Sequence, residues 1–414
     1  MAWTKTFGAN GAIFVFGLVG GVIIARSLGT EGRGALETLT YWPHFLAGFA
    51  ALGLNEAIAI RVARERIRPR LVATTFILSI GIATLLGLVL IVLLPFLMHG
   101  SRAAQVPAAM LYMAIFLPAT FLSQNLLAIS QGNLDFGRFN AQRLVQSALY
   151  PVMLLAFLLA GKLDVGTAAI SMLAGTVVVS LLRMWDVKGE LLRKPAWSDA
   201  RGMLSTGLKL HLASMAMFLS SQIDTMILVN FGTNHELGLY VAALVFGRTG
   251  IGLLVQTFIT IALPKMARAE SLHRHRAELL RQLTILLFVS LVAVVVGAVL
   301  LPIVVPLLMG QNYVDAVPSG RILLLAFAVA GMRKAMIYIL RSRLTNLPAI
   351  IAESATAILI AIIGYFSFKS YGLVGLSATV LLANIAGTLL LVPFFLQELR
   401  GDRSDSFNSK KVLT

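Results

Sequence analysis

Cysteine is absent from the sequence, and charged residues are scarce. The lack of cysteine among 414 residues excludes disulfide bonds, thiolate metal sites and cysteine nucleophiles. Only 13% of the residues are charged and 58% are hydrophobic, whereas a soluble domain carries about 25% charged and about 45–50% apolar residues. A soluble core cannot hide this excess, so we expect lipid to be the solvent of much of the chain.

The apolar residues gather in long runs that do not alternate with polar ones. Because a membrane helix needs about 20 mostly apolar residues, and only helices or closed barrels satisfy backbone groups in lipid, these runs predict an all-α polytopic membrane protein. We expect about twelve transmembrane spans, at 8–25, 38–60, 72–98, 107–130, 143–161, 166–183, 206–229, 237–262, 283–307, 320–340, 348–367 and 372–396. No cleavage pattern follows the N-terminal segment, so the first span is expected to stay as an anchor.

Lysine and arginine predict the orientation. With the N-terminus inside, 25 of them lie in inner segments, including five between Arg61 and Arg70, and 6 lie in outer segments. Short cytoplasmic loops carry the excess of these residues, so both termini are expected to be cytoplasmic. The net charge of +16 then reflects inner loops, and no nucleic-acid partner is expected.

The two halves of the chain resemble each other. An offset of 203 residues pairs Gly29-Thr30 with Gly232-Thr233, and an offset of 204 residues pairs Gly34 with Gly238 and Arg61–Arg64 with Lys265–Arg268. We therefore expect two pseudo-symmetric six-helix bundles, residues 1–195 and 196–400, followed by a polar cytoplasmic tail at 401–414. Two halves of this kind are a common plan for transporters.

Charged residues within the spans are the first candidates for function, because a charge in the bilayer is costly and faces a cavity or a partner. Arg248 lies eleven residues into its span, about 16 Å deep at 1.5 Å per residue. It is a candidate cation for an anionic substrate or a buried partner for Asp224 on the preceding span. Asp224 is also a candidate for proton or cation coupling, and Arg333 is a third candidate cation that could instead snorkel to the inner surface.

Neutral polar residues lie at mid-depth in several other spans. Together they predict a polar interior, although each one alone is more typical of a hydrogen bond between helices; they are His44, Gln124, Asn125 and Asn384. Arg26, beside the first outer turn, is a candidate contact for a phosphate group or an interfacial anchor. His273 and His275 lack companions at ligand spacing, so no metal is expected, and no cofactor is expected. The absence of a Gly-Lys-Ser/Thr loop argues against a built-in ATPase.

Several stretches resemble one known family, the bacterial polysaccharide exporters, which are lipid-linked oligosaccharide flippases of the multidrug/oligosaccharidyl-lipid/polysaccharide superfamily. The stretches are Ile24–Gly34; Ala128–Gly132 with Phe136 and Phe139; Gln222–Thr225 followed by Gly238–Tyr240 and Ala242; Leu263-Pro264 with Ala267; and Met309–Tyr313 with Ala316.

This resemblance implies two helical bundles around a central cavity, and transfer of a polyprenyl-diphosphate-linked oligosaccharide from the inner to the outer leaflet by alternating access. It implies a cationic cavity, to which Arg26, Arg248 and Arg333 are carried over. The expected location is the bacterial inner membrane, with membrane lipid, a coupling proton or sodium ion and polysaccharide-assembly proteins as partners.

A multidrug or cation antiporter of the same fold is the alternative. A membrane polymerase or ligase is disfavoured by the short outer loops, and a non-transporting scaffold remains a further possibility.

Overall fold

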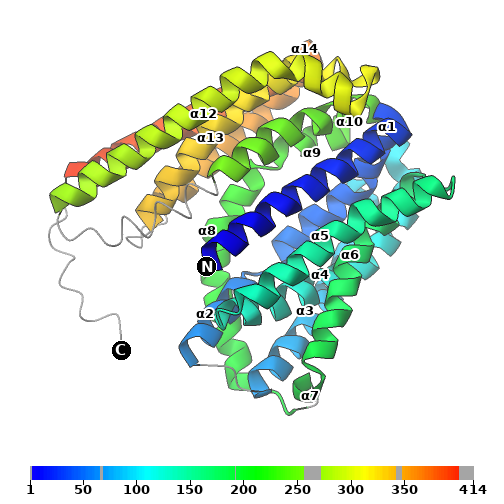
Figure 1. The fold of residues 1–414 in the computed structure, drawn as a ribbon, viewed down its shortest axis with the longest axis vertical. Coiled ribbons are helices and arrows are strands. Elements are labelled where there is room, and N and C mark those ends of the chain that lie inside the picture. Colours follow the sequence, from blue (N-terminus) through cyan, green and yellow to red (C-terminus); the bar gives the residue numbers. More distant parts are fainter. Residues whose placement is uncertain (1, 66–68, 192, 256–271, 342–346, 401–414) are drawn as a thin grey trace. The chain divides into compact units, whose positions relative to one another are not determined.

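The computed structural model describes residues 2–65, 69–191, 193–255, 272–341 and 347–400. Every regular element within these ranges is a helix (Figure 1). Nine of the described helices are long and apolar enough to cross a membrane. Of these, α14 contains two of the predicted spans, and α1 contains the first predicted span and part of the second. The prediction of an all-helical, multi-pass membrane protein is therefore confirmed. The predicted tail at 401–414 and the loop Lys265–Arg268 lie outside the described residues.

The helices follow the predicted spans in order. The bounds are α1 (Ala2–Ala50), α2 (Leu54–Glu65), α3 (Pro69–Leu97), η1 (Gly100–Gln105), α4 (Val106–Gly132), α5 (Phe136–Leu159), α6 (Val165–Asp186), α7 (Lys188–Leu191), α8 (Trp197–Ser220), α9 (Ile223–Phe231), α10 (Asn234–Leu244), η2 (Val245–Ile251), α12 (Leu272–Met309), η3 (Gln311–Tyr313), α13 (Ala316–Arg341) and α14 (Leu347–Arg400). The short elements η1 and η3 are 3₁₀ turns, whereas η2 is a π-helix.

Two glycines lie at kinks inside long helices, at points where the sequence predicts the end of one span and the start of the next. Gly29 lies within α1 at φ 64°, and Gly372 lies within α14 at φ 59°. Positive φ is accessible to glycine without a steric penalty, so each glycine kinks a continuous run of helix between two spans. The predicted outer turn from Arg26 to Gly34 is consequently helical except at Gly29.

Two predicted spans are interrupted. The span at 38–60 breaks at Ala51–Gly53, where Leu52 and Gly53 have positive φ. A Cβ on Gly53 would lie 2.4 Å from the carbonyl oxygen of Gly207 in α8, so the break allows two backbones to approach closely. The span at 206–229 is divided between α8 and α9. The break between α8 and α9 lies in the polar run Ser220–Asp224, whereas the break at Ala51–Gly53 lies in an apolar run and has no hydropathy signal of its own.

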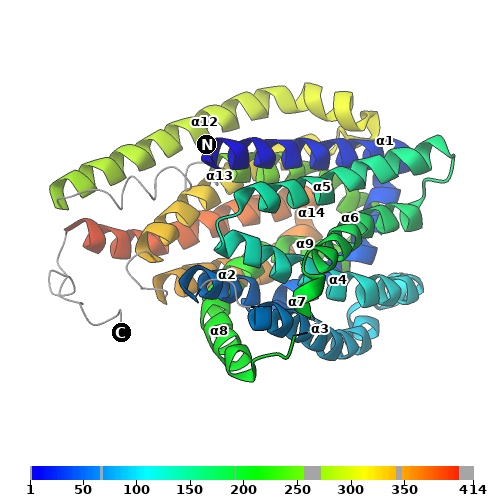
Figure 2. The ribbon, with the colours of Figure 1, turned by 60° about the horizontal axis from the view of Figure 1, so that its bottom comes forward.

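The contacts divide the chain into two compact units. Unit 1 comprises Met1–Phe218, Thr225–Ala242 and Pro306–Tyr313, and unit 2 comprises Leu219–Asp224, Ala243–Val305 and Val314–Thr414. In unit 1, α1 runs beside α5, as both views show (Figures 1 and 2), and α3 packs along α4. In unit 2, α13 packs along α14.

In unit 1, α1 and α10 cross closely at residues that are related by the 204-residue offset. A Cβ on Gly34 would lie 1.8 Å from the carbonyl oxygen of Asn234, and a Cβ on Gly238 would lie 2.0 Å from that of Thr30. The offset maps Thr30 onto Asn234 and Gly34 onto Gly238, so the contact is reciprocal. The Thr30 hydroxyl also shares a 2.8 Å hydrogen bond with Nδ1 of His235. This local contact is therefore symmetric under the offset of 204 residues.

Candidate functional site

Arg248 and Asp224 form an ion pair within unit 2. Nη2 of Arg248 donates to both Oδ1 and Oδ2 of Asp224 at 2.9 Å. The Asp224 side chain is 3% exposed, whereas that of Arg248 is 28% exposed. The carboxylate is therefore enclosed by protein, while part of the guanidinium faces outward.

A π-helix places the Arg248 side chain. Arg248 lies in the middle of η2, and its guanidinium carbon is 5.4 Å from the centre of the Phe327 ring. A π-helical turn inserts an extra residue and often marks a functional site. Here it follows directly on α10. Gly247 allows the turn to approach α13, since a Cβ there would lie 2.9 Å from the Phe327 ring.

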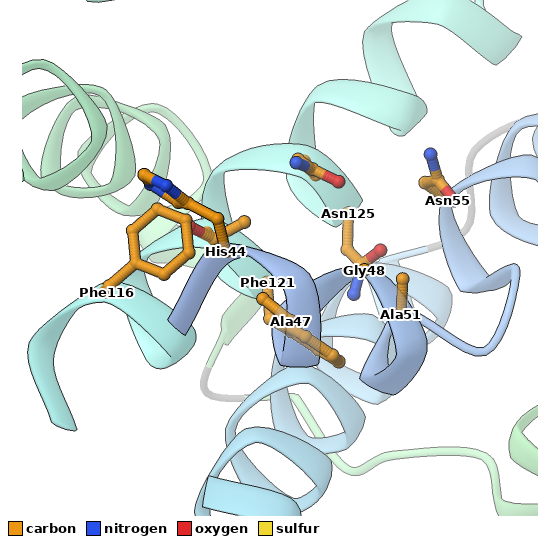
Figure 3. Close-up of a pocket in the computed structure, with 10 residues that line it drawn as sticks. His44, Ala47, Gly48, Ala51, Asn55, Phe116, Phe121 and Asn125 are labelled. Carbon is orange, nitrogen blue, oxygen red and sulfur yellow. The ribbon is translucent and has the colours of Figure 1, made fainter. Parts of the chain in front are cut away.

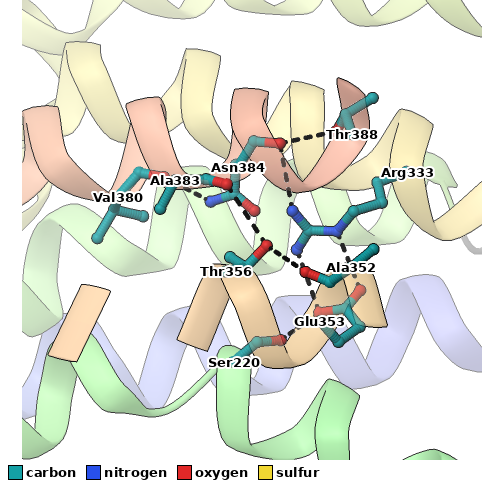
Figure 4. Close-up of polar contacts among 9 residues, drawn as sticks. All are labelled: Ser220, Arg333, Ala352, Glu353, Thr356, Val380, Ala383, Asn384 and Thr388. Carbon is teal, nitrogen blue, oxygen red and sulfur yellow. Dashed lines mark hydrogen bonds and ion pairs between the residues drawn. The ribbon is translucent and has the colours of Figure 1, made fainter. Parts of the chain in front are cut away.

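Arg333 lies in a buried network, also within unit 2 (Figure 4). Its Nε donates to Oε1 of Glu353 at 3.0 Å, and its Nη2 donates to Oε2 at 3.2 Å. The hydroxyl of Ser220 also donates to Oε2 of Glu353. Both members of the pair are 5% exposed at their side chains, so this two-pronged geometry fixes Arg333 against Glu353.

Asn384 completes the network through its backbone. Its carbonyl oxygen accepts hydrogen bonds from Nη1 of Arg333 at 3.3 Å and from the hydroxyl of Thr388 at 2.8 Å (Figure 4). Its side-chain amide donates to the carbonyl of Val380 at 2.7 Å. Asn384 is 4% exposed. The side-chain amide therefore bonds its own helix.

A pocket of about 150 Å³, with both polar and apolar walls, lies in unit 1 (Figure 3). Three of the four predicted neutral polar residues line it: His44 from α1, and Gln124 and Asn125 from α4. Asn55, Phe116, Thr120 and Phe121 contribute further side chains, and Ala47, Gly48 and Ala51 contribute small ones.

Hydrogen bonds and aromatic packing hold two sides of this pocket. His44 shares a 3.1 Å hydrogen bond between its Nε2 and the Tyr112 hydroxyl, and its ring packs edge to face on Phe116 with centroids 4.4 Å apart. Asn125 is 4% exposed and donates to the Ser79 hydroxyl at 3.0 Å. These contacts fix both side chains before any ligand arrives.

Arg26 is exposed and does not line this pocket. Its Nε donates to the carbonyl of Leu308 at 2.8 Å, and its Nη2 donates to that of Leu307. Both carbonyls belong to the last turn of α12, where backbone acceptors lack partners within the helix. In this structure Arg26 therefore caps a helix end.

A second pocket, of about 260 Å³, lies in unit 2 and is apolar. Phe246, Ile251 and Leu254 line it from η2 and the helical turn that follows, and Leu300 and Val304 line it from α12. Its chemistry contrasts with that of the pocket beside His44. Among the described residues, no group of three or more His, Asp or Glu side chains is placed to hold a metal ion.

The structure thus brings the predicted residues together in three groups. These are Asp224 with Arg248; Arg333 with Asn384; and His44 with Gln124 and Asn125. Sequence reasoning placed Asn384 with the other polar residues, whereas its side chain bonds its own helix. It also missed Asn55, because that residue lies just beyond a helix break that hydropathy does not signal.

Comparison of the sequence with known proteins identifies a family. The family model described as "Polysaccharide biosynthesis protein" matches residues 2–270. A comparison with curated proteins found no match.

Solved structures share the fold. A multidrug resistance MATE family transporter of the MOP superfamily, in an inward-facing conformation, is 17% identical with a TM-score of 0.74, over 95% of this chain and 96% of that one. The lipid II flippase MurJ, in an inward closed conformation, is 16% identical with a TM-score of 0.76, over 96% and 88%. A MOP superfamily transporter from Pyrococcus furiosus is 16% identical with a TM-score of 0.64, over 97% and 96%. The chain has the fold of the MOP superfamily, and by its sequence it belongs to the polysaccharide biosynthesis protein family.

Proposed function

We propose that this protein is a flippase and not an enzyme. It moves a polyprenyl-diphosphate-linked oligosaccharide, a precursor of a surface polysaccharide, from the inner to the outer leaflet by alternating access. Membership of a polysaccharide biosynthesis family supports the substrate class. The shared fold with a lipid II flippase and with multidrug transporters supports transport.

The partly exposed guanidinium of Arg248 is the observation that carries this proposal. Arginine is well suited to phosphate because its planar N–H groups form charge-assisted hydrogen bonds. Arg248 is 28% exposed, whereas Arg333 is 5% exposed and fully engaged by Glu353. Arg248 is therefore the residue that binds the diphosphate, and Arg333 supports the surrounding helices.

Asp224 is the proposed coupling residue. Its carboxylate competes with the substrate diphosphate for the same guanidinium, because Arg248 is its ion-pair partner. A coupling proton or sodium ion that engages the Asp224 carboxylate would weaken this competition and so be linked to substrate binding.

Arg26 has a secondary place in the proposal. It is exposed, and its hydrogen bonds to Leu307 and Leu308 engage only Nε and Nη2. A guanidinium has five N–H donors. Among the residues that the structure describes, the donors of Nη1 have no partner and are available to a passing phosphate, and Arg26 is proposed as a weak contact and not as the anchor.

A multidrug antiporter is the second candidate, because the fold is shared with a MATE transporter. An uncompensated carboxylate would attract an organic cation. In unit 2 the carboxylates of Asp224 and Glu353 are each paired with an arginine. This pairing favours an anionic substrate over a cationic one.

We further propose the arrangement in the cell. The protein resides in the bacterial inner membrane with both termini in the cytoplasm, as the lysine and arginine distribution predicts. Residues 1–195 and 196–400 are the two repeated six-span halves. Polysaccharide-assembly proteins are the partners that supply and receive the lipid-linked sugar.

The cellular test replaces Arg248 with Ala in a deletion strain and measures surface polysaccharide at matched expression. We expect export to fall strongly while lipid-linked oligosaccharide accumulates in the inner leaflet. Arg321→Ala is the matched control, since Arg321 is an exposed arginine of unit 2 that bonds the Ala298 carbonyl at 2.9 Å. Unchanged export in Arg248→Ala would remove Arg248 from the mechanism.

A further inference from the structure

The pocket beside His44 has the size of a single six-membered ring. Its volume is about 150 Å³, and a protein cavity of about 150 Å³ with apolar walls accepts benzene. A polyprenyl chain or a whole oligosaccharide is far larger. One ring of the substrate, or one small cyclic molecule, is therefore the scale of ligand that fits.

The residues that line the pocket favour a polar ring that carries no charge. Amide groups come from Asn55, Gln124 and Asn125, and none of the ten lining residues is Lys, Arg, Asp or Glu. Amides present both donors and acceptors, which matches the hydroxyl groups of a sugar. A hydrocarbon ring would leave these amides without partners, at a cost, and an acidic ring would lack a counter-charge.

Two features prepare the pocket for such a ligand. Asn125 is 4% exposed and its amide nitrogen is held by the Ser79 hydroxyl at 3.0 Å, so its oxygen is fixed as an acceptor. Asn55 and Gln124 make no side-chain hydrogen bond to the part of the protein that the structure describes. Their amides are thus available to a ligand.

Aromatic rings complete the wall. Phe116 packs against His44, and Phe121 lines the same pocket (Figure 3). The face of an aromatic ring carries negative partial charge, and the C–H face of a pyranose offers weakly positive hydrogens to it. Amides that bind the rim of a sugar and aromatic rings that pack on its face are complementary to the two chemical sides of a pyranose.

We propose that this pocket binds one uncharged sugar ring of the lipid-linked substrate. The inference rests on the proposed flippase function and deepens it, because it makes the pocket between α1, α2 and α4 a determinant of which sugars are carried. A neutral hexose is accepted, and a uronic acid at the same position is disfavoured.

The test uses the purified full chain in proteoliposomes with three probes: polyprenyl diphosphate, the same lipid linked to glucose, and the same lipid linked to glucuronic acid. For the wild type we expect a lower apparent KM for the glucose probe than for the glucuronic acid probe. Gln124→Met and Asn55→Leu should each raise the apparent KM for the glucose probe about tenfold, the scale of one or two lost hydrogen bonds. Both should leave transport of the sugar-free lipid unchanged.

Gln131→Met is the matched control, because Gln131 is exposed on the same helix and does not line the pocket. If both pocket variants match the wild type on all three probes, the pocket is not a sugar site, although flippase activity of the wild type still stands. If the wild type moves no probe, the proposed function fails. Saturation-transfer NMR with methyl glucoside then decides: a signal that Gln124→Met abolishes supports the sugar site, and no signal in the wild type overturns it.

Discussion

Four of the described arginines illustrate two kinds of partner, carboxylates and backbone carbonyls at helix ends. Arg248 and Arg333 pair with carboxylates inside unit 2. Arg26 and Arg102 instead donate to carbonyls at helix ends, Arg102 to Leu228 at 3.1 Å and to Gly232 at 2.7 Å. In the pair of Arg333 with Glu353 both side chains are 5% exposed, so two opposite charges lie in a region that excludes most water, and the loss of one partner alone is costly.

Loss of Arg333 alone should destabilise the protein strongly. Arg333→Met leaves the Glu353 carboxylate buried without its counter-charge, which costs about 3–5 kcal/mol. The double variant Arg333→Met with Glu353→Met should regain most of the loss, since two apolar side chains replace the pair. Thermal unfolding in detergent measures both, with Arg321→Met as the exposed control. An unchanged unfolding midpoint in the single variant would contradict the buried pair.

Asp164 gives a pH-dependent effect at the start of α6. Its Oδ1 accepts from the backbone N–H of Thr167 at 2.7 Å, and the hydroxyl of Thr167 bonds the backbone N–H of Asp164 at 2.8 Å. The hydrogen bond from the Thr167 backbone lowers the pKa of the Asp164 carboxyl below its usual value. A lowered folded-state pKa adds stability above the unfolded-state pKa, and this stability is lost as the pH falls through the folded-state pKa.

Asp164→Ala should therefore cost about 1 kcal/mol at neutral pH, the usual value of an N-cap. The cost should shrink in strong acid, where the wild-type carboxyl is protonated. Asp164→Asn, which keeps the capping oxygen without its charge, should lie between the two. Unfolding midpoints at pH 7 and pH 3 check this, and an equal deficit of Asp164→Ala at both values would count against the charged cap.

At the element scale, the sequence predicted helices better than it predicted their joints. The long apolar runs specified α3 and α4 almost to their ends, whereas α12 begins at Leu272, eleven residues before its predicted span. The kinks at Gly29 and Gly372 and the break at Leu52-Gly53 depend on close backbone contacts or on φ angles. A single sequence does not encode such contacts in any local pattern.

The candidate site was predictable to a similar extent. The cost of a mid-membrane charge singled out Arg248 and Asp224, and the structure pairs them. The same argument singled out Arg333, although it did not show that Glu353 and Ser220 enclose it. The Asn125 side chain lines a pocket, whereas the Asn384 side chain bonds its own helix. The packing of neighbouring helices determines this difference, and the sequence does not show it.

The reciprocal crossing at Gly34 and Gly238 should tolerate no side chain. Gly34→Ala and Gly238→Ala each place a methyl group within about 2 Å of a backbone oxygen, and such overpacking costs about 1–3 kcal/mol or more. The double variant should cost less than the sum, because either change alone separates the same two helices. Gly17→Ala is the control, since no described heavy atom lies within 4 Å of its added Cβ. Additive effects in the unfolding midpoint would contradict a shared crossing.

At the scale of the whole molecule, the cysteine-free chain allows a direct test of orientation. Lys162→Cys, between α5 and α6, should react with a membrane-impermeant maleimide in intact cells, after outer-membrane permeabilisation if one is present. Lys194→Cys, between α7 and α8, should react only after the inner membrane is opened. Both lysines are exposed, so reactivity reports their side of the membrane. The reverse pattern would contradict cytoplasmic termini.

The central claim is that this protein carries an anionic lipid-linked sugar on Arg248. The most direct measurement is the initial rate at which a fluorescent polyprenyl-diphosphate-linked disaccharide crosses the bilayer of proteoliposomes. We predict a rate well above that of empty vesicles for the wild type and for Arg321→Ala, and a rate at least about tenfold lower for Arg248→Ala, since a charge-assisted hydrogen bond contributes about 1.5–3 kcal/mol. A wild-type rate equal to that of empty vesicles, or an Arg248→Ala rate equal to the wild type, would contradict the claim.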